Sequence, residues 1–203
     1  IAPKHTRAAA AISCGADIVF ELPFAYATSS AEFFASGAVA LLNSLKKIDF
    51  LVFGAENNDI SVLSSAADIL INEPEEFKSR LNSCLLSGMS FPAAREQAYI
   101  ICGGCEGIFT PNNTLAIEYI KALKKFSSDT KPIAIQRVGS GYNDKDYSKK
   151  KGYISASAFR AKAENIVNSF SSDPDTDSSS ELDSFLFETL PSSSAGIMLS
   201  CHN

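Results

Sequence analysis

Hydroxyl groups and a cation lie together in the segment Ile154-Ser-Ala-Ser-Ala-Phe-Arg160. Ser155 and Ser157 fall at the expected start of a helix, and Arg160 follows about one turn later. Backbone amides at a helix start, hydroxyl groups and a guanidinium are all groups that bind phosphate oxygens. The pattern therefore favours a phosphate site over the alternative, which is an N-capped helix that carries an exposed arginine.

A second arginine, Arg137, ends an expected strand and leads into the loop Val138-Gly-Ser-Gly-Tyr142. Its forked guanidinium matches phosphate oxygens, although a surface arginine before a flexible loop would have the same pattern. Gly54 follows another expected strand and, because it lacks a Cβ, allows a ligand to approach the backbone. Taken alone, Gly54 is more simply interpreted as a turn glycine.

Two adjacent asparagines, Asn112 and Asn113, begin a further expected helix after Pro111. Asparagine caps helix amides well, and a second carboxamide would remain free to bond a base edge or a ribose. The simpler interpretation, that the two asparagines only cap the helix, has at least equal weight. The acids Glu21, Glu32 and Glu56 are candidate catalytic groups, but each also has an ordinary structural role.

Other catalytic patterns are missing from the sequence. His5 and His202 lie near the two ends and form no Ser/His/Asp arrangement, and there is no phosphate-binding GxxxxGK[ST] motif. Five cysteines in a chain of this size indicate free thiols in a reducing cytoplasm. We expect Cys102 and Cys105 to lie in a turn rather than to form a zinc or redox site, because too few further ligands are available.

An alternating pattern of helices and strands must position these residues. Strands are expected at 17–22, 49–53 and 132–137. A capping box at 29–32 predicts the start of a helix, and the other expected helices are 4–15, 60–71, 74–87, 92–101, 112–126 and 157–167. This order predicts an α/β layered fold with a parallel sheet. Ligands of such sheets bind beyond the carboxyl ends of the strands.

Length and composition describe an ordinary globular protein. The 203 residues are 45% hydrophobic and 20% charged with a net charge of −5, which excludes a wholly disordered or collagen-like chain. No apolar stretch approaches the roughly 18 residues of a membrane span, and no secretory leader is visible. We expect a domain at 1–168. A serine-rich linker and partial C-terminal segment is expected at 169–203, with one short helix around Leu182–Leu190.

Charge is concentrated in residues 121–162, which hold eleven Lys or Arg and three acids. That segment therefore has a net charge of +8 in an otherwise acidic chain. It is a candidate surface for nucleotide phosphates or RNA, and a solvated lysine-rich loop is an equal alternative.

Several of these segments together resemble one enzyme family. They are Ala16–Phe24, Ala27–Gly37, Phe53–Glu56, Pro111–Leu115 with Glu118-Tyr119, Arg137 before Gly141-Tyr142, and Ser155–Arg160. In order and rough spacing they resemble the tRNA(Met) cytidine acetate ligase family over about residues 1–165. Each segment is weak alone, and the series is specific.

The resemblance implies a Rossmann-like nucleotidyltransferase of the HxGH superfamily, an α/β fold whose parallel sheet is flanked by helices. It implies that ATP activates acetate as acetyl-adenylate, and that the acetyl group then passes to N4 of the wobble cytidine of elongator tRNA(Met). Mg²⁺ is expected with ATP. The implied partners are tRNA(Met) and acetate, without membrane or DNA, in the cytoplasm.

The resemblance also assigns roles to residues. Gly54, Asn112 and Arg137 would bind ATP, with Asn113 in place of Asn112 if the register is shifted by one. Ser155, Ser157 and Arg160 match the phosphate-contacting serine motif of the superfamily.

The chain departs from the family in several places. The first strand and the HxGH motif of the family would precede Ile1, so no catalytic residue is assigned, and this fragment alone is expected to bind nucleotide poorly. Asn143 stands where many relatives carry histidine, and Ala116 where glycine is common. Two alternatives stay open: another adenylyl- or cytidylyltransferase on the same scaffold, or a non-catalytic nucleotide- or RNA-binding remnant.

Overall fold

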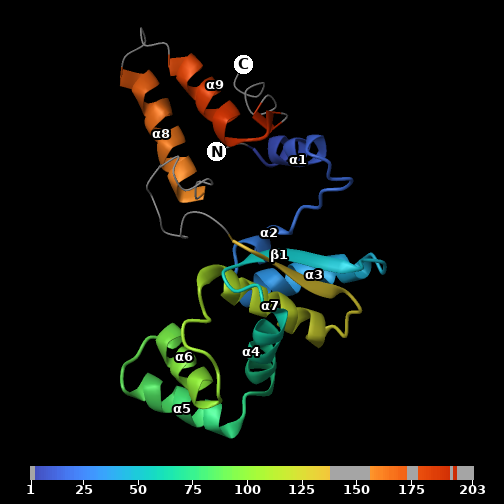
Figure 1. Cartoon of the computed structure of the whole chain (residues 1–203), viewed down its shortest axis with the longest axis vertical. Helices are drawn as coiled ribbons and strands as arrows, with labels where there is room; N and C mark the ends of the chain where they lie inside the picture. The colour runs from blue at the N-terminus through green and yellow to red at the C-terminus, as the bar shows by residue number, and fades with distance from the viewer. Residues whose placement is uncertain (1–2, 138–155, 173–177, 193, 196–203) are drawn as a thin grey trace. The chain divides into compact units, whose positions relative to one another are not determined.

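The computed structural model describes residues 3–137, 156–172, 178–192 and 194–195. The chain divides into two compact units, Leu22–Arg137 and Ile1–Glu21 with Val138–Asn203, and each is described by itself. The described elements, labelled in Figure 1, are α1 (Lys4–Ser13), α2 (Phe24–Ala27), α3 (Ala31–Ser44), β1 (Phe50–Ala55), α4 (Ile60–Asn72), α5 (Glu75–Leu86), α6 (Phe91–Ile101), α7 (Pro111–Lys125), β2 (Lys131–Gln136), α8 (Ala156–Ser172) and α9 (Ser178–Thr189). None of the described helices is long and apolar enough to cross a membrane.

Strands β1 and β2 pair in parallel, with Phe50 opposite Lys131 and Ala55 opposite Gln136. At the carboxyl end of the two strands the Arg137 amide donates to the Ala55 carbonyl at 2.9 Å, which adds one hydrogen bond to those between β1 and β2. Parallel neighbours need a long crossover, and helices α4 to α7 provide it. The predicted α/β class with a parallel sheet is therefore confirmed in the unit Leu22–Arg137.

Helix α7 lies at the centre of this unit and packs against α3, α4 and β1 (Figure 1). Its apolar stripe buries Ile117 and Ile120, while α4 contributes Leu63 and Ala66, all at most 2% exposed. The stripe follows the spacing of three and four residues that places side chains on one helix face. This packing positions the first turn of α7 beside the carboxyl end of β1.

Helices α5 and α6 pack closely against each other, with Phe77, Ala98 and Tyr99 buried. The turn after α6 contains Gly104, where an added Cβ would lie 2.2 Å from the Tyr99 ring. Only glycine therefore fits this position without moving the ring.

In the other unit, the described parts of α8 and α9 pack through Ile166, Phe185 and Leu186. The rings of Phe159 and Phe185 stack with their centroids 5.1 Å apart. Helix α9 confirms the short helix expected in the serine-rich segment. The domain boundary at 168/169 stays a prediction.

Two local expectations are wrong. Residues 17–22 form no strand, and Ile18 and Phe20 are 68% and 47% exposed. A strand requires a hydrogen-bonded neighbour, and this apolar run has none in the part of the chain that the structure describes. The capping box also fails, because α3 starts after Ser30 without a side-chain cap while the Ser29 hydroxyl donates to the Ala25 carbonyl.

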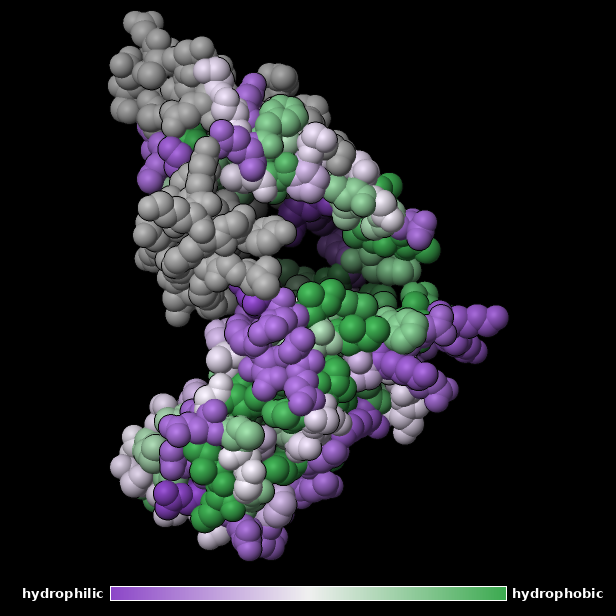
Figure 2. Space-filling view, viewed as in Figure 1, coloured by the Kyte–Doolittle hydropathy of each residue, from purple (hydrophilic) through white to green (hydrophobic). Residues whose placement is uncertain are grey.

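One face of the two-stranded sheet carries large exposed apolar side chains. Phe50 and Val52 of β1 and Ile133 and Ile135 of β2 are 39% to 59% exposed. Figure 2 shows hydrophobic surface where Figure 1 places α2 and the strands. The opposite face contacts α4 and α7, so in this unit the sheet is packed mainly on one side.

Candidate functional site

The carboxyl end of the sheet brings together residues that are far apart in sequence. Gly54 is exposed near the end of β1, and Arg137 directly follows β2. The Cγ of Arg137 lies 3.7 Å from the place that a Cβ on Gly54 would take. The backbone of Gly54 and the arginine side chain thus border the same open surface, as the parallel register requires.

The first turn of α7 adds the third predicted residue. The Arg137 Nη1 donates to the Asn112 Oδ1 at 3.5 Å, which is at the outer limit of a hydrogen bond. Arg137 is exposed, so this long contact orients its guanidinium and leaves other N–H groups available to a ligand. Gly54, Asn112 and Arg137 therefore form one continuous surface.

A carboxylate on the loop after β1 holds this arrangement. Glu56 accepts hydrogen bonds from the Thr110 hydroxyl at 2.6 Å, from the Asn113 amide at 2.9 Å and from the Asn112 Nδ2 at 2.5 Å. Thr110 is the N-cap residue of α7, and its own side chain does not cap the helix. Glu56 therefore caps α7 from a different element and fixes the carboxamide that faces Arg137.

The electrostatics of Glu56 follow from these contacts. Partial burial by itself raises the pKa of Glu56, but the hydrogen bonds from Asn112, Thr110 and the Asn113 amide outweigh it, so that the net pKa is lowered. A carboxylate near a helix N-terminus is also favoured by the helix dipole. Glu56 is thus held ionised at neutral pH.

Comparison with known proteins identifies the family. The family model described as HIGH nucleotidyl transferase matches residues 1–198. The chain belongs to the HIGH nucleotidyl transferase family. This confirms the Rossmann-like fold that the resemblance implied.

Individual relatives within this group carry a more specific name. A tRNA(Met) cytidine acetate ligase of Caldicellulosiruptor bescii is 45% identical over 166 residues, which are 82% of this chain and 41% of the relative. The crystal structure of Thermotoga maritima TmcAL in apo form I matches with a TM-score of 0.81 at 31% identity, over 97% of this chain and 44% of that one. The same protein bound with alpha-thio ATP matches with a TM-score of 0.75 at 30% identity, covering 97% and 43%.

These matches confirm the resemblance to tRNA(Met) cytidine acetate ligases. The chain spans less than half the length of the curated relative and of both solved structures.

Within this nucleotidyl transferase fold the two asparagines have different roles. Asn113 is 2% exposed, and its Oδ1 accepts from the Asn57 amide at 2.9 Å, which ties α7 to the loop after β1. Asn112 instead faces Arg137. The expectation of one free carboxamide is not met, since both are engaged. The geometry favours Asn112 over Asn113 as the residue that faces a ligand.

The serine motif is described only in part. Ser155 lies outside the described residues. Arg160 is exposed on α8, and its Nη2 donates to the Ser157 hydroxyl at 3.4 Å. Because α8 belongs to the second compact unit, the phosphate role of Ser157 and Arg160 stays a prediction.

The remaining candidates lie elsewhere. Glu21 forms an ion pair with Lys4 at 2.8 Å, and Glu32 lies 3.8 Å from Lys121. Cys102 and Cys105 are free thiols, as is Cys84. In the described ranges no group of three His, Cys, Asp or Glu side chains is placed to hold a metal.

The chemistry available here is binding and charge stabilisation. An open glycine backbone, a carboxamide and a guanidinium suit phosphate and ribose oxygens. Glu56 is poorly suited to be a general base, because both of its oxygens already accept hydrogen bonds. No local pattern in the sequence predicts that Glu56 caps α7, and its position two residues after Gly54 is the available signal.

Proposed function

We propose that this chain serves the ATP-dependent activation of acetate and its transfer to N4 of the wobble cytidine of elongator tRNA(Met). The observation that carries the proposal is the linked set of Gly54, Arg137, Asn112 and Glu56 at the carboxyl end of the sheet. Ligands of open α/β sheets bind at this edge. The relatives named tRNA(Met) cytidine acetate ligase and the alpha-thio ATP complex of TmcAL support it.

The proposed reaction has two balanced steps. A carboxylate oxygen of acetate attacks the α-phosphorus of ATP, which forms acetyl-adenylate and releases pyrophosphate. The N4 amine of cytidine then attacks the acetyl carbonyl, loses a proton and displaces AMP. Negative charge grows on the phosphate in the first step, and Arg137 is placed to stabilise it. Holding acetate and ATP together removes much of the entropic barrier.

Asn112 and Gly54 contribute position rather than charge. The Gly54 backbone allows ATP to approach closely, and the Asn112 carboxamide, held by Glu56, offers a fixed polar group. Mg²⁺ would arrive with the ATP phosphates. Glu56 is not suited to bind Mg²⁺, because its carboxylate oxygens already accept hydrogen bonds from Asn112, Thr110 and Asn113. In this proposal elongator tRNA(Met) is the RNA that receives the acetyl group, and the protein acts in the cytoplasm.

The proposal is tested with the completed protein, which includes the HxGH segment expected before Ile1, together with ATP, labelled acetate and an elongator tRNA(Met) transcript. We expect acetate-dependent release of AMP and labelled N4-acetylcytidine after nuclease digestion. Arg137→Ala should lower acetyl-adenylate formation at least tenfold, about 1.4 kcal/mol of transition-state stabilisation. Arg80→Ala, which removes an exposed arginine of α5, is the matched control.

Three outcomes would contradict the proposal. Near-normal turnover of Arg137→Ala would remove its assigned role. ATP turnover without dependence on acetate would indicate a different nucleotidyltransferase. Binding of alpha-thio ATP or tRNA without any turnover would indicate a non-catalytic nucleotide- or RNA-binding protein.

A further inference from the structure

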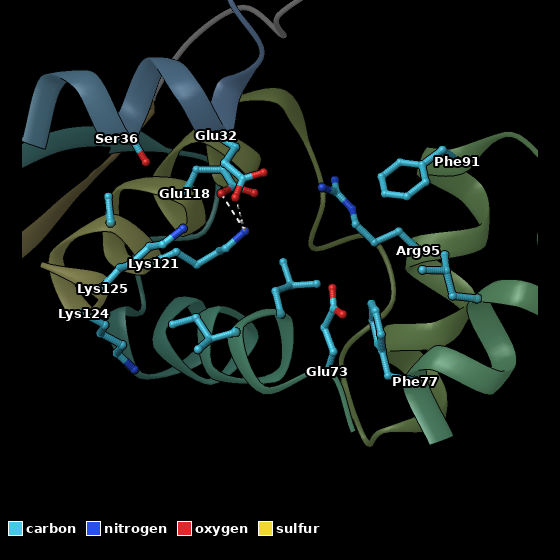
Figure 3. A pocket seen from close by; sticks show the side chains of 14 residues that line it. Glu32, Ser36, Glu73, Phe77, Phe91, Arg95, Glu118, Lys121, Lys124 and Lys125 are labelled. Atoms are coloured by element: carbon cyan, nitrogen blue, oxygen red, sulfur yellow. Dashed lines mark ion pairs between the residues drawn. The ribbon is translucent and has the colours of Figure 1, made fainter. Parts of the chain in front are cut away.

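A cavity of about 490 Å³ lies within the unit Leu22–Arg137, away from the surface described above. Figure 3 shows its side chains: Glu32 and Ser36 come from α3, Glu118 and Lys121 from α7, and Phe91 and Arg95 from α6. None of Gly54, Glu56, Asn112 and Arg137 lines it. The volume is within the range of pockets that hold small organic ligands.

Two of the three lysines that line the cavity, Lys121 and Lys124, are already neutralised. The Lys121 Nζ lies 2.9 Å from Oε2 of the buried Glu118, and 3.8 Å from Glu32. The first contact is ionic without hydrogen-bond geometry, because that Oε2 has no hydrogen-bond partner. The Lys124 Nζ lies 2.6 Å from Asp68. Neither lysine therefore offers an uncompensated charge to a ligand.

Arg95 is different. Its Nε is buried without a hydrogen-bond partner, and none of the ion pairs among the described residues includes Arg95. One side of its guanidinium lies over the Phe109 ring, 4.3 Å from the centroid. Figure 3 shows the side chain extending from α6 into the space between α6 and α7. A buried donor without a partner is costly, and the guanidinium that carries this Nε lines the cavity, where an anionic ligand would accept hydrogen bonds from it.

The surroundings of Arg95 indicate which anion fits. Burial lowers the pKa of Arg95, and the negative charges of Glu118 and Glu96 partly oppose this effect. Apolar side chains form much of the lining, including Leu70, Phe77, Leu81 and Phe91. The single planar guanidinium of Arg95 favours a ligand with one carboxylate group. The apolar lining favours a ligand whose remaining part is hydrocarbon. The nearby carboxylates disfavour a doubly charged phosphate.

We propose that this cavity binds a small organic carboxylate, with its carboxylate group on Arg95 and its apolar body against Phe77, Leu81 and Phe91. The proposal does not depend on the proposed function, because the residues assigned to ATP lie outside the cavity. It identifies Arg95 as the residue that selects for negative charge.

Glu73 provides an internal competitor for this site. It ends α4 in a left-handed conformation with φ 41°, and Figure 3 shows its side chain at the cavity. No ion pair joins Glu73 to Arg95 or to another residue of the described chain. Its negative charge should repel a bound carboxylate, so removing that charge should strengthen binding.

The test measures binding of benzoate to the full chain by isothermal titration calorimetry. Benzamide is the neutral control of the same shape, and inorganic phosphate is the control for a different anion. We expect saturable benzoate binding and much weaker binding of benzamide and of phosphate. Arg95→Gln should weaken benzoate binding at least tenfold, about 1.4 kcal/mol. Arg95→Lys should retain part of the affinity, and Arg80→Gln should change nothing.

Equal binding of benzoate and benzamide, or of benzoate and phosphate, would overturn the proposal. Unchanged affinity in Arg95→Gln would do the same. If Arg95→Gln does not fold, Glu73→Gln decides the matter, since it should bind benzoate more tightly than the unmodified chain. Unchanged or weaker binding by Glu73→Gln would contradict the assignment, because a carboxylate held in this cavity must respond to that charge.

Discussion

At the scale of single residues, Glu56 connects the backbone of the sheet to the group that faces a ligand. Its carboxylate accepts from Asn112, Thr110 and the Asn113 amide. We predict that Glu56→Gln weakens alpha-thio ATP binding by about tenfold, because a hydrogen bond to a charged acceptor contributes about 1.5–3 kcal/mol. Equilibrium dialysis measures this, with Glu106→Gln on an exposed loop as the control. Equal affinities in the two variants would contradict a positioning role for Glu56.

The same residue makes stability depend on pH. Folding lowers the pKa of Glu56 from its ordinary value of 4.5. The Glu56 carboxylate therefore contributes fully to the free energy of unfolding above pH 4.5, and this contribution is lost as the pH falls through the folded pKa. We predict that Glu56→Gln loses less stability than the unmodified chain between neutral pH and pH values below about 4.5. Urea unfolding at several pH values measures this difference. Parallel curves for the two proteins would show that Glu56 is not stabilised as a carboxylate.

At the scale of elements, α5 depends on one buried ring. Phe77 is 2% exposed in the central core, whereas Leu86 on the same helix is 90% exposed. We predict that Phe77→Ala lowers the free energy of unfolding by about 3–5 kcal/mol, since it removes the ring and leaves a cavity. Leu86→Ala should change it by less than about 0.5 kcal/mol. Urea denaturation compares the two, and similar losses would contradict the described packing of α5.

At the scale of the whole molecule, positive charge is gathered in residues 121–162 of an acidic chain. If about six of its eleven cations contact phosphates, tRNA affinity should fall about 10³-fold between roughly 50 and 200 mM salt. Fluorescence anisotropy with a labelled elongator tRNA(Met) transcript measures this slope. An affinity that does not change with salt would contradict an electrostatic RNA surface.

Local sequence patterns predicted most of the elements. The helices α4 to α7 agree with their expected ranges to within one residue at every end, because apolar spacing and proline or glycine boundaries act over a few neighbouring residues. The same reasoning failed at 17–22, where the apolar pattern was present but no neighbouring strand pairs with it in the described chain. It also missed α2, a single turn that has no periodic pattern to detect.

From the amino-acid sequence alone we could predict the α/β order, the strands β1 and β2, and Gly54, Asn112 and Arg137 as candidate residues. Only the tertiary structure placed these three side by side, because their proximity depends on the parallel register and on the crossover through α7. It also decided that Glu56 caps α7 and that Arg95 lines a cavity without an ion pair. Hydrogen bonds and burial between distant residues arise from packing, which no local pattern encodes.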